Sequence, residues 1–197
     1  MNIYDHSCLS VRKFGGSIED YYAIHKFIDS SKLYYFNVKH RSMLHHLYGI
    51  DLCIRKFGDY VVNQQNKTIL VRDIAAEHLK EDFSGQVPSL YDWFKDSEEM
   101  LAPSIIVPKI ESLELRAFIL EPLLRSNLNA SLCITISNFG VYLVKEFLGT
   151  EQAINYQKIL SPNTVISQYL THFKFTERWQ YSPDRNELLW LKNNKNG

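Results

Sequence analysis

Residues 34–57 read YYFNVKHRSMLHHLYGIDLCIRKF, and Gly58 follows them. At about 100° per residue, the apolar side chains of this stretch fall on one side of a helix. A glycine directly after the last apolar residue is typical of a helix C-terminus. The stretch therefore predicts one long helix from Tyr34 to Phe57, and it makes the first half of the chain mainly helical.

Shorter elements are expected on both sides of this helix. In the first half they are a helix ending at Gly15, a helix starting at Ser17, a β-hairpin over residues 60–62 and 68–71, a helix from Asp73 to Phe83 and a short helix after Ser89. Polar residues with turn preferences separate the two expected strands, as in a hairpin. The first half should therefore contain several helices and one small sheet.

The second half has a mixed pattern, and residues 96–103 (DSEEMLAP) form the best linker before it. Its expected elements are a helix over 112–127, a strand over 132–137, a helix or second strand over 138–148, helices over 150–160 and 162–175, and a closing hairpin over 179–181 and 188–191. We therefore expect an α+β fold: a mostly helical N-terminal half with a small β-hairpin and a mixed α/β C-terminal half. The expected units are a helical, histidine-rich module over 1–97 and an α+β module over 98–197, with one continuous domain as the alternative.

Composition restricts the class of protein. The 197 residues include 22 Lys plus Arg and 22 Asp plus Glu, so the net charge is zero, which argues against a broadly basic nucleic-acid coat. The three cysteines (Cys8, Cys53 and Cys133) are an odd number without a CxxC pair, so we expect reduced thiols. The N-terminus lacks a signal-peptide pattern, and no stretch approaches the roughly 20 apolar residues of a membrane span. A cytoplasmic protein is expected.

Histidines are the most unusual feature, because six of the seven lie within the first 78 residues. On one regular helix His45 would point nearly opposite to the apolar stripe, whereas His46 lies at one flank of that stripe, so the two could not bind one ion together. His78 and Asp82 have the i, i+4 spacing that places two side chains on one helix face. The residues proposed to hold a divalent transition metal are His40, His46, His78 and Asp82. We expect His78 to face His40 or His46, and His45 to point away. The alternative is that these histidines donate hydrogen bonds between helices.

Basic residues suggest a second kind of site. The candidate anion-binding residues are Lys32, Arg41, His45, Arg55 and Arg72. Guanidinium and ammonium groups are the usual partners of phosphate. The alternative is a solvated polar stripe balanced by Asp51.

Residues 5–95 also resemble an uncharacterised family of small phage and bacterial proteins known as a domain of unknown function. The matching stretches are His6, RKFGG (Arg12–Gly16), EDY (Glu19–Tyr21), Ile24-His25, Ser31-Lys32, His40-Arg41, His45-His46, Gly49-Ile50, Phe57-Gly58, Val71-Arg72, Glu77-His78, Glu81-Asp82, Pro88 and Asp92-Trp93. The resemblance implies a shared helical module and a phage or bacterial origin, with the host cytoplasm as the location if the protein is phage-encoded. It implies no activity.

Two functions from different classes remain open. The sequence lacks the glycine-rich phosphate loop, the nucleophile elbow, the zinc-protease signature, the EF-hand loop and the His-Asp dipeptide of known enzyme classes. The favoured hypothesis is a phage-type accessory protein that binds a host or viral macromolecule, with a protein partner or a second copy of the chain expected, nucleic acid less so and no membrane. The alternative is a metal-dependent hydrolase of phosphate esters or nucleotides that uses the His/carboxylate cluster.

Overall fold

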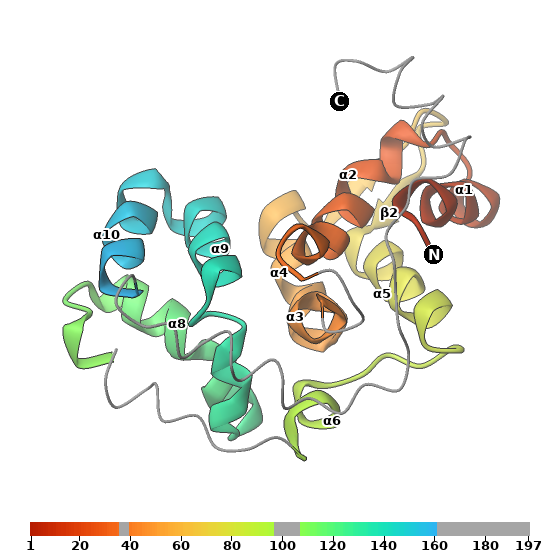
Figure 1. The fold of residues 1–197 in the computed structure, drawn as a ribbon. Coiled ribbons are helices and arrows are strands. Elements are labelled where there is room, and N and C mark those ends of the chain that lie inside the picture. The colour runs from red at the N-terminus through yellow and green to blue at the C-terminus, as the bar shows by residue number, and fades with distance from the viewer. Residues whose placement is uncertain (36–39, 97–106, 161–197) are drawn as a thin grey trace.

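The computed structural model describes residues 1–35, 40–96 and 107–160, and this part of the chain is mostly helical (Figure 1). The first half contains α1 (Ile3–Phe14), α2 (Glu19–Ile28), the 3-10 helix η1 (Asp29–Leu33), α3 (Arg41–Leu44), α4 (Leu47–Phe57), β1 (Tyr60–Val62), β2 (Thr68–Leu70), α5 (Val71–Asp82) and α6 (Leu90–Phe94). The second half contains the 3-10 helix η3 (Val107–Lys109), α8 (Leu113–Ser126), the 3-10 helix η4 (Asn129–Cys133), α9 (Asn138–Leu148) and α10 (Thr150–Leu160). None of the described helices has the length and apolar character needed to cross a membrane.

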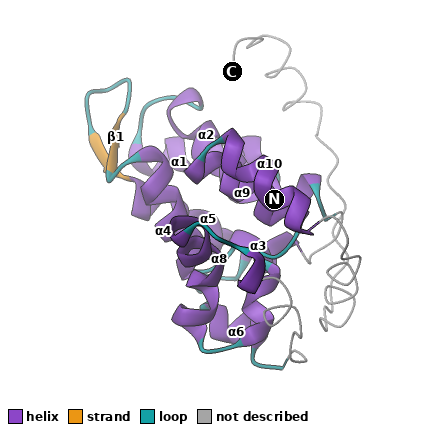
Figure 2. Cartoon of the chain, turned by 90° about the vertical axis from the view of Figure 1, so that its left-hand side faces the viewer, coloured by secondary structure: helices purple, strands orange, loops and turns teal. Residues whose placement is uncertain are grey.

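The predicted β-hairpin is confirmed. Strands β1 and β2 are antiparallel, with Tyr60 opposite Leu70 and Val62 opposite Thr68. Asn66 in the connecting turn has φ 57°, a left-handed conformation that asparagine tolerates better than most residues. Figure 2 shows the two strands at one edge of the helical body. The expected class, mostly helical with one small hairpin, is thus confirmed.

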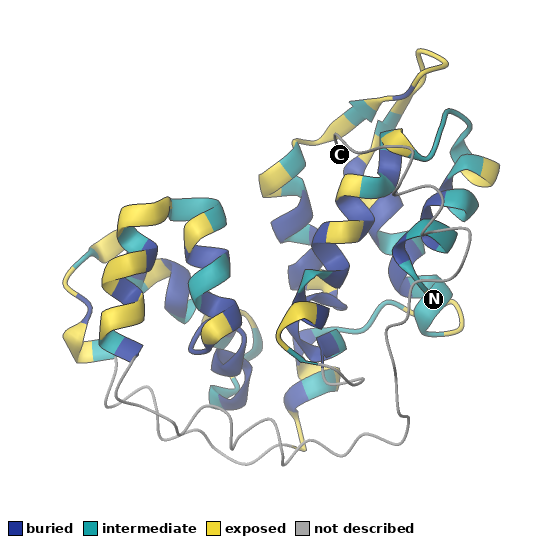
Figure 3. Cartoon of the chain, turned by 45° about the horizontal axis from the view of Figure 1, so that its top comes forward, coloured by how far each residue is buried: buried dark blue, intermediate teal, exposed yellow. Residues whose placement is uncertain are grey.

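Helical periodicity builds the core of the first half. Along α5 the buried residues are Val71, Ile74, Ala75, His78 and Leu79, a spacing of i, i+3, i+4, i+7 and i+8. Helices α2, α4 and α5 pack against one another, and Figure 3 shows their buried residues on the faces turned inward. His78 therefore lies on the buried stripe of α5 by its position in the repeat.

The prediction of one long helix from Tyr34 to Phe57 is wrong. Residues 36–39 lie outside the described part of the chain, α3 is a single turn, and the chain bends at His45 and His46 before α4 begins. His46 is the N-cap of α4, with an extended backbone at φ −159° and ψ 171°. Its Nδ1 accepts a hydrogen bond of 3.0 Å from the backbone N–H of Gly49, which satisfies one free donor at the helix start.

This bend depends on a close approach of the backbone at Gly49. A Cβ atom added there would lie 1.8 Å from the carbonyl oxygen of Leu44, so the turn admits only glycine. The same turn recurs before α9. Ser137 is the extended N-cap at φ −160° and ψ 172°, its Oγ accepts from the N–H of Gly140, and a Cβ at Gly140 would lie 1.7 Å from the carbonyl oxygen of Thr135.

The second half is helical where the structure describes it, and two of its helices were predicted correctly at 112–127 and 150–160. The prediction of a strand over 132–137 is wrong, because residues 129–133 form η4 and the next residues turn into α9. Of the two alternatives for 138–148, the structure has the helix. Residues 132–136 are all buried, and a short apolar run suits a buried strand and a buried turn equally well. The helix expected over 162–175 and the closing hairpin lie outside the described residues.

Ion pairs and aromatic contacts join the two halves. Glu121 of α8 accepts hydrogen bonds from Arg55 of α4 and from Arg125 of its own helix. Lys56 pairs with Glu146 of α9, and the ring of Phe27 lies 6.2 Å from that of Phe147 in an edge-on contact. The units expected at 1–97 and 98–197 stay a prediction, but their described parts are in direct contact.

We predict that Glu121→Gln destabilises the protein in a pH-dependent way. Burial alone would raise the pKa of Glu121, but the two arginines outweigh it and hold the pKa below the usual 4.5. A carboxyl whose pKa is lowered by folding stabilises the fold above its unfolded pKa, and this stabilisation is lost as the pH falls through the folded pKa. Urea unfolding should therefore show a loss of about 1 kcal/mol at pH 7 that shrinks in acid.

The control for this experiment is Glu114→Gln, because Glu114 is exposed on the same helix. The control should unfold like the wild type at both pH values. An equal loss for Glu121→Gln at neutral and acidic pH would contradict the role of the ion pairs.

Candidate metal centre

Histidines and aspartates from several elements meet in the interior of the first half. The residues are His6 on α1, His25 on α2, Asp29 on η1, His40 and His45 at the two ends of α3, and His78 and Asp82 on α5. All five of these imidazoles are fully buried, and the Asp82 side chain is 3% exposed. Polar groups at this depth need partners, because transfer from water without them is costly.

Helix periodicity brings these side chains inward. In α1 the buried residues are Ile3, His6, Ser7 and Ser10, and in α2 they include Tyr21, Ile24, His25 and Ile28. Both sets follow the i, i+3, i+4, i+7 pattern of a core-facing stripe. The histidines thus occupy positions where the pattern calls for an apolar residue.

One group of potential ligand atoms consists of Asp29, His45 and His78. The Nε2 atoms of the two histidines are 3.2 Å apart. Asp29 Oδ1 lies 3.4 Å from His45 Nε2 and 3.8 Å from His78 Nε2. These three atoms surround one point in the protein interior.

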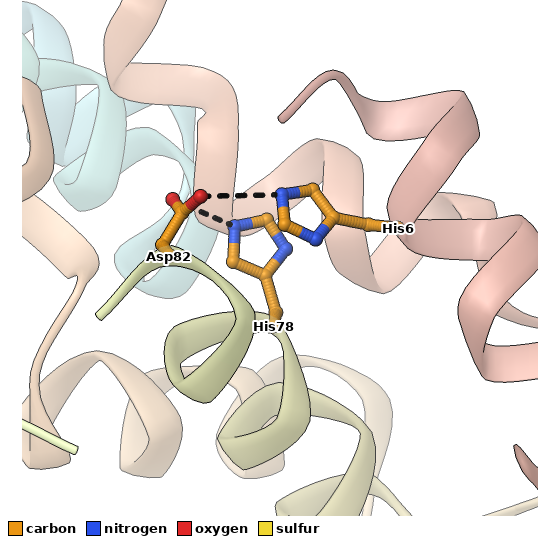
Figure 4. A group of neighbouring side chains, drawn as sticks. All are labelled: His6, His78 and Asp82. Carbon is orange, nitrogen blue, oxygen red and sulfur yellow. Dashed lines mark ion pairs between the residues drawn. The ribbon is translucent and has the colours of Figure 1, made fainter. Parts of the chain in front are cut away.

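A second group shares His78 and adds His6 and Asp82 (Figure 4). His6 Nε2 lies 3.7 Å from Asp82 Oδ1, and His78 Nε2 lies 4.0 Å from Asp82 Oδ2. The rings of His6 and His78 are stacked with their centres 3.8 Å apart. His45 Nε2 is 3.3 Å from Asp82 Oδ2, so the two groups form one continuous cluster.

The spacing of these atoms suits a metal ion. Metal–ligand bonds of about 2.1 Å place neighbouring ligands about 3.0–3.4 Å apart in octahedral or tetrahedral geometry. The distances within the group of Asp29, His45 and His78 are 3.2, 3.4 and 3.8 Å. Two imidazoles and one carboxylate form a donor set that suits Fe, Zn and related divalent ions, and such a set leaves coordination positions open.

Outer partners orient the histidine rings. Glu81 accepts a hydrogen bond of 2.5 Å from His6 Nδ1, which leaves His6 Nε2 facing Asp82. His25 Nδ1 contacts His78 Nδ1 at 3.0 Å, which leaves His78 Nε2 facing Asp29. Metal-binding histidines commonly use one ring nitrogen for the metal and the other for such a partner.

Several buried atoms of the cluster lack the hydrogen bonds that their position demands. Among the described residues, neither His6 Nε2 nor Asp29 Oδ1 has a hydrogen-bond partner. Both atoms face other members of the cluster at 3.4–3.8 Å, which is too far for a hydrogen bond of good geometry. A metal ion among Asp29, His45 and His78 would satisfy Asp29 Oδ1, whereas His6 Nε2 belongs to the second group.

The protonation states of the buried histidines and aspartates also favour metal binding. Burial of the His78 ring lowers its pKa well below 6.5, and burial lowers the pKa of His25 to about 3. Burial alone would raise the pKa of Asp29 and of Asp82, but the imidazoles beside them hold both below the usual 3.8. Neutral imidazoles and ionised carboxylates are the states that bind a metal.

Basic side chains flank both carboxylates. Lys32 Nζ lies 2.5 Å from Asp29 Oδ2, and a terminal nitrogen of Arg41 lies 3.1 Å from Asp82 Oδ1. The Arg41 and Glu81 side chains are 12% and 18% exposed, so the cluster approaches the surface on their side.

The structure brings together some of the metal ligands expected from the sequence. His78 and Asp82 lie in the cluster, and His40 lies at its edge with Nε2 3.7 Å from Asp29 Oδ1. His46 does not reach it, because its ring caps α4 and its Nε2 contacts the Ser42 carbonyl. The expectation that His45 points away is wrong: the bend after α3 turns its ring to face His78.

The proposed anion site does not form as one group. Lys32, Arg41 and His45 belong to the cluster, whereas Arg55 pairs with Glu121 and Arg72 lies 3.7 Å from Asp51. The expected stripe relied on an unbroken helix, and the bend at residues 45–46 divides it.

Sequence reasoning missed Asp29, His6 and the role of His25. One signal was available: the chain contains His-x3-Asp twice, at His25/Asp29 and at His78/Asp82. The i, i+4 spacing places both members of each pair on one helical face. His6 carried no comparable pattern, because its partners come from a helix more than 70 residues away.

The chain belongs to a family of uncharacterised proteins. Residues 1–101 match the domain of unknown function DUF6915, which confirms the resemblance expected over 5–95. The whole histidine/aspartate cluster lies inside the matched segment. No curated protein and no solved structure is detectably similar to the chain.

We predict that Gly49→Ala displaces His45 and disrupts the cluster. The added Cβ would collide with the Leu44 carbonyl, so the turn must open at a cost of about 3 kcal/mol. Gly140→Ala is the matched control, because the same collision occurs at the turn before α9, remote in the chain from the histidines.

Both variants should lose similar stability in urea unfolding. Only Gly49→Ala should alter the NMR signals of the buried histidine rings. Unchanged histidine signals in Gly49→Ala would contradict the role of this turn in placing His45.

Proposed function

We propose that this protein binds one divalent transition metal ion through Asp29, His45 and His78, with Asp82 completing the site. The observation that carries the proposal is the mutual spacing of the three ligand atoms, 3.2–3.8 Å, in a fully buried position. The unsatisfied Oδ1 atom of Asp29 supports it independently. The donor set of imidazole nitrogens and carboxylate oxygens favours Mn, Fe, Co, Ni or Zn.

A single ion fits better than two. The two candidate groups share His78, and an imidazole can bridge two ions only if both of its nitrogens bind metal. His78 Nδ1 is engaged with His25.

The alternative to a metal is a cluster held by protons and ion pairs alone. In that arrangement Lys32 and Arg41 would balance Asp29 and Asp82. The orphaned Asp29 Oδ1 argues against it, because an unpaired carboxylate oxygen in the interior lowers stability. Metal analysis separates the two arrangements directly.

We expect the protein, purified without a histidine tag and dialysed against Zn²⁺ or Mn²⁺, to retain about one equivalent of metal. Asp29→Asn and His78→Ala should each reduce this content to near zero. The matched control is His46→Asn, because His46 is equally buried but caps α4, and asparagine is a good N-cap. Less than about a tenth of an equivalent in the wild type, or equal loss in the control, would overturn the proposal.

A second candidate function is the hydrolysis of phosphate esters or nucleotides, and the position of Arg41 favours it. Arg41 forms an ion pair with Asp82 at the more exposed side of the cluster, and its Nε is buried without a hydrogen-bond partner among the described residues. A guanidinium beside a metal can bind a phosphate oxygen. A bound divalent ion would supply an activated water molecule.

The test of this second function is the hydrolysis of p-nitrophenyl phosphate and of nucleoside triphosphates by the metal-loaded protein. We expect Arg41→Ala to lower kcat/KM at least about tenfold while the metal content is retained. Arg55→Ala is the control, because Arg55 belongs to the Glu121 ion pairs. Absence of turnover in the metal-loaded wild type would exclude this function and leave metal binding intact.

A role as a phage-type accessory protein that binds a macromolecule has weaker support. Among the described residues, the most exposed apolar side chains are Leu33 at the end of η1 and Leu113 and Leu124 near the two ends of α8. Scattered exposed leucines are normal for a protein surface and do not by themselves define a docking site.

A further inference from the structure

A line of polar contacts runs from α1 to the proposed metal site. Ser10 Oγ lies 2.9 Å from His25 Nε2, and His25 Nδ1 lies 3.0 Å from His78 Nδ1. Both histidines are fully buried and Ser10 is 2% exposed. Water therefore has little access to these groups, so the proton positions depend on the contacts between them.

The contact between two Nδ1 atoms requires one of them to carry the proton. A neutral imidazole has one N–H donor and one acceptor nitrogen, so a hydrogen bond between the two rings fixes both tautomers together. If His78 Nδ1 donates, His25 Nδ1 accepts and His25 Nε2 carries a proton. That Nε2–H can donate only to Ser10 Oγ, at 2.9 Å.

This direction leaves His78 Nε2 without a proton, and Nε2 is the atom that faces Asp29 and His45. The opposite direction would place a proton on His78 Nε2 and block a metal there. The Ser10 hydroxyl can donate or accept, so it is compatible with both directions, and a metal ion bound at His78 Nε2 selects the first. In that state Ser10 Oγ accepts from His25 Nε2–H while His25 Nδ1 accepts from His78.

We propose that Ser10 and His25 are positioning residues that hold His78 in its Nδ1–H tautomer, so that Nε2 is presented to the metal. This inference rests on the proposed metal-binding function. It assigns to α1 and α2 a part in metal affinity, although neither Ser10 nor His25 would touch the ion. Outer hydrogen-bond partners of this kind typically change metal affinity by about 10–100-fold.

The first measurement is the protonation of the two rings in the Zn²⁺-loaded protein, read from long-range ¹H–¹⁵N correlations of the imidazole rings. The wild type should show Nδ1–H at His78 and Nε2–H at His25, the direction that leaves His78 Nε2 to the metal. His25→Leu removes the acceptor for His78 Nδ1–H, and His25→Asn places an amide oxygen near the position of His25 Nδ1.

The second measurement is the affinity for Zn²⁺ and the visible spectrum of the Co²⁺-loaded protein. His25→Leu should weaken Zn²⁺ binding by about 10–100-fold and change the Co²⁺ spectrum, and His25→Asn should recover most of the affinity. Ser10→Ala should weaken binding less than His25→Leu. Its matched control is Ser7→Ala, since Ser7 is also buried on α1 but donates only to the Ile3 carbonyl.

The outcomes distinguish the positioning role of Ser10 and His25 from the proposed metal binding. Unchanged Zn²⁺ affinity in His25→Leu would overturn the positioning role of His25 and leave the metal site standing. A proton on His25 Nδ1 in the Zn²⁺-loaded wild type would also overturn it. Failure of the wild type to take up any metal would overturn the proposed function and the inference together.

Discussion

Burial of two ionised aspartates among imidazoles is the constraint on which the N-terminal half depends. Removing a carboxylate from water costs several kcal/mol, so each one needs opposing charge or hydrogen-bond donors at short range. Asp29 pairs with Lys32 and Asp82 pairs with Arg41, and imidazole nitrogens of His40 and His45 lie 3.3–3.7 Å from the two carboxylates. The elements from α1 to α5 are therefore held together by polar contacts at their centre, with apolar packing around them.

Much of the secondary structure could be read from the sequence because it follows from local rules. The hairpin at β1–β2 has strands separated by turn residues, and α10 shows a regular apolar pattern. The bend at His45–His46 could not be read in this way. Histidine is not a usual N-cap, and the need for glycine at position 49 appears only when the Leu44 carbonyl is in place.

The candidate site was predictable to the extent that single helices define it. The pair His78 and Asp82 followed from i, i+4 spacing, and the same rule applied to His25 and Asp29 would have added a second pair. The positions of His6 and His45 depend on how α1 and the bend pack against α5, which no local pattern encodes. Because the sequence predicted one unbroken helix through residues 34–57, it also predicted the wrong direction for the His45 side chain.

The turns before α4 and α9 have the same backbone conformation, and this conformation does not require a polar side chain at the position of His45. In the turn before α9, the residue equivalent to His45 is Ile136, which is also fully buried. One backbone shape thus delivers an aliphatic side chain to a core in one half and an imidazole to a carboxylate cluster in the other. The turn fixes only where the side chain is delivered, and the residue at that position decides whether an apolar core or a polar cluster receives it.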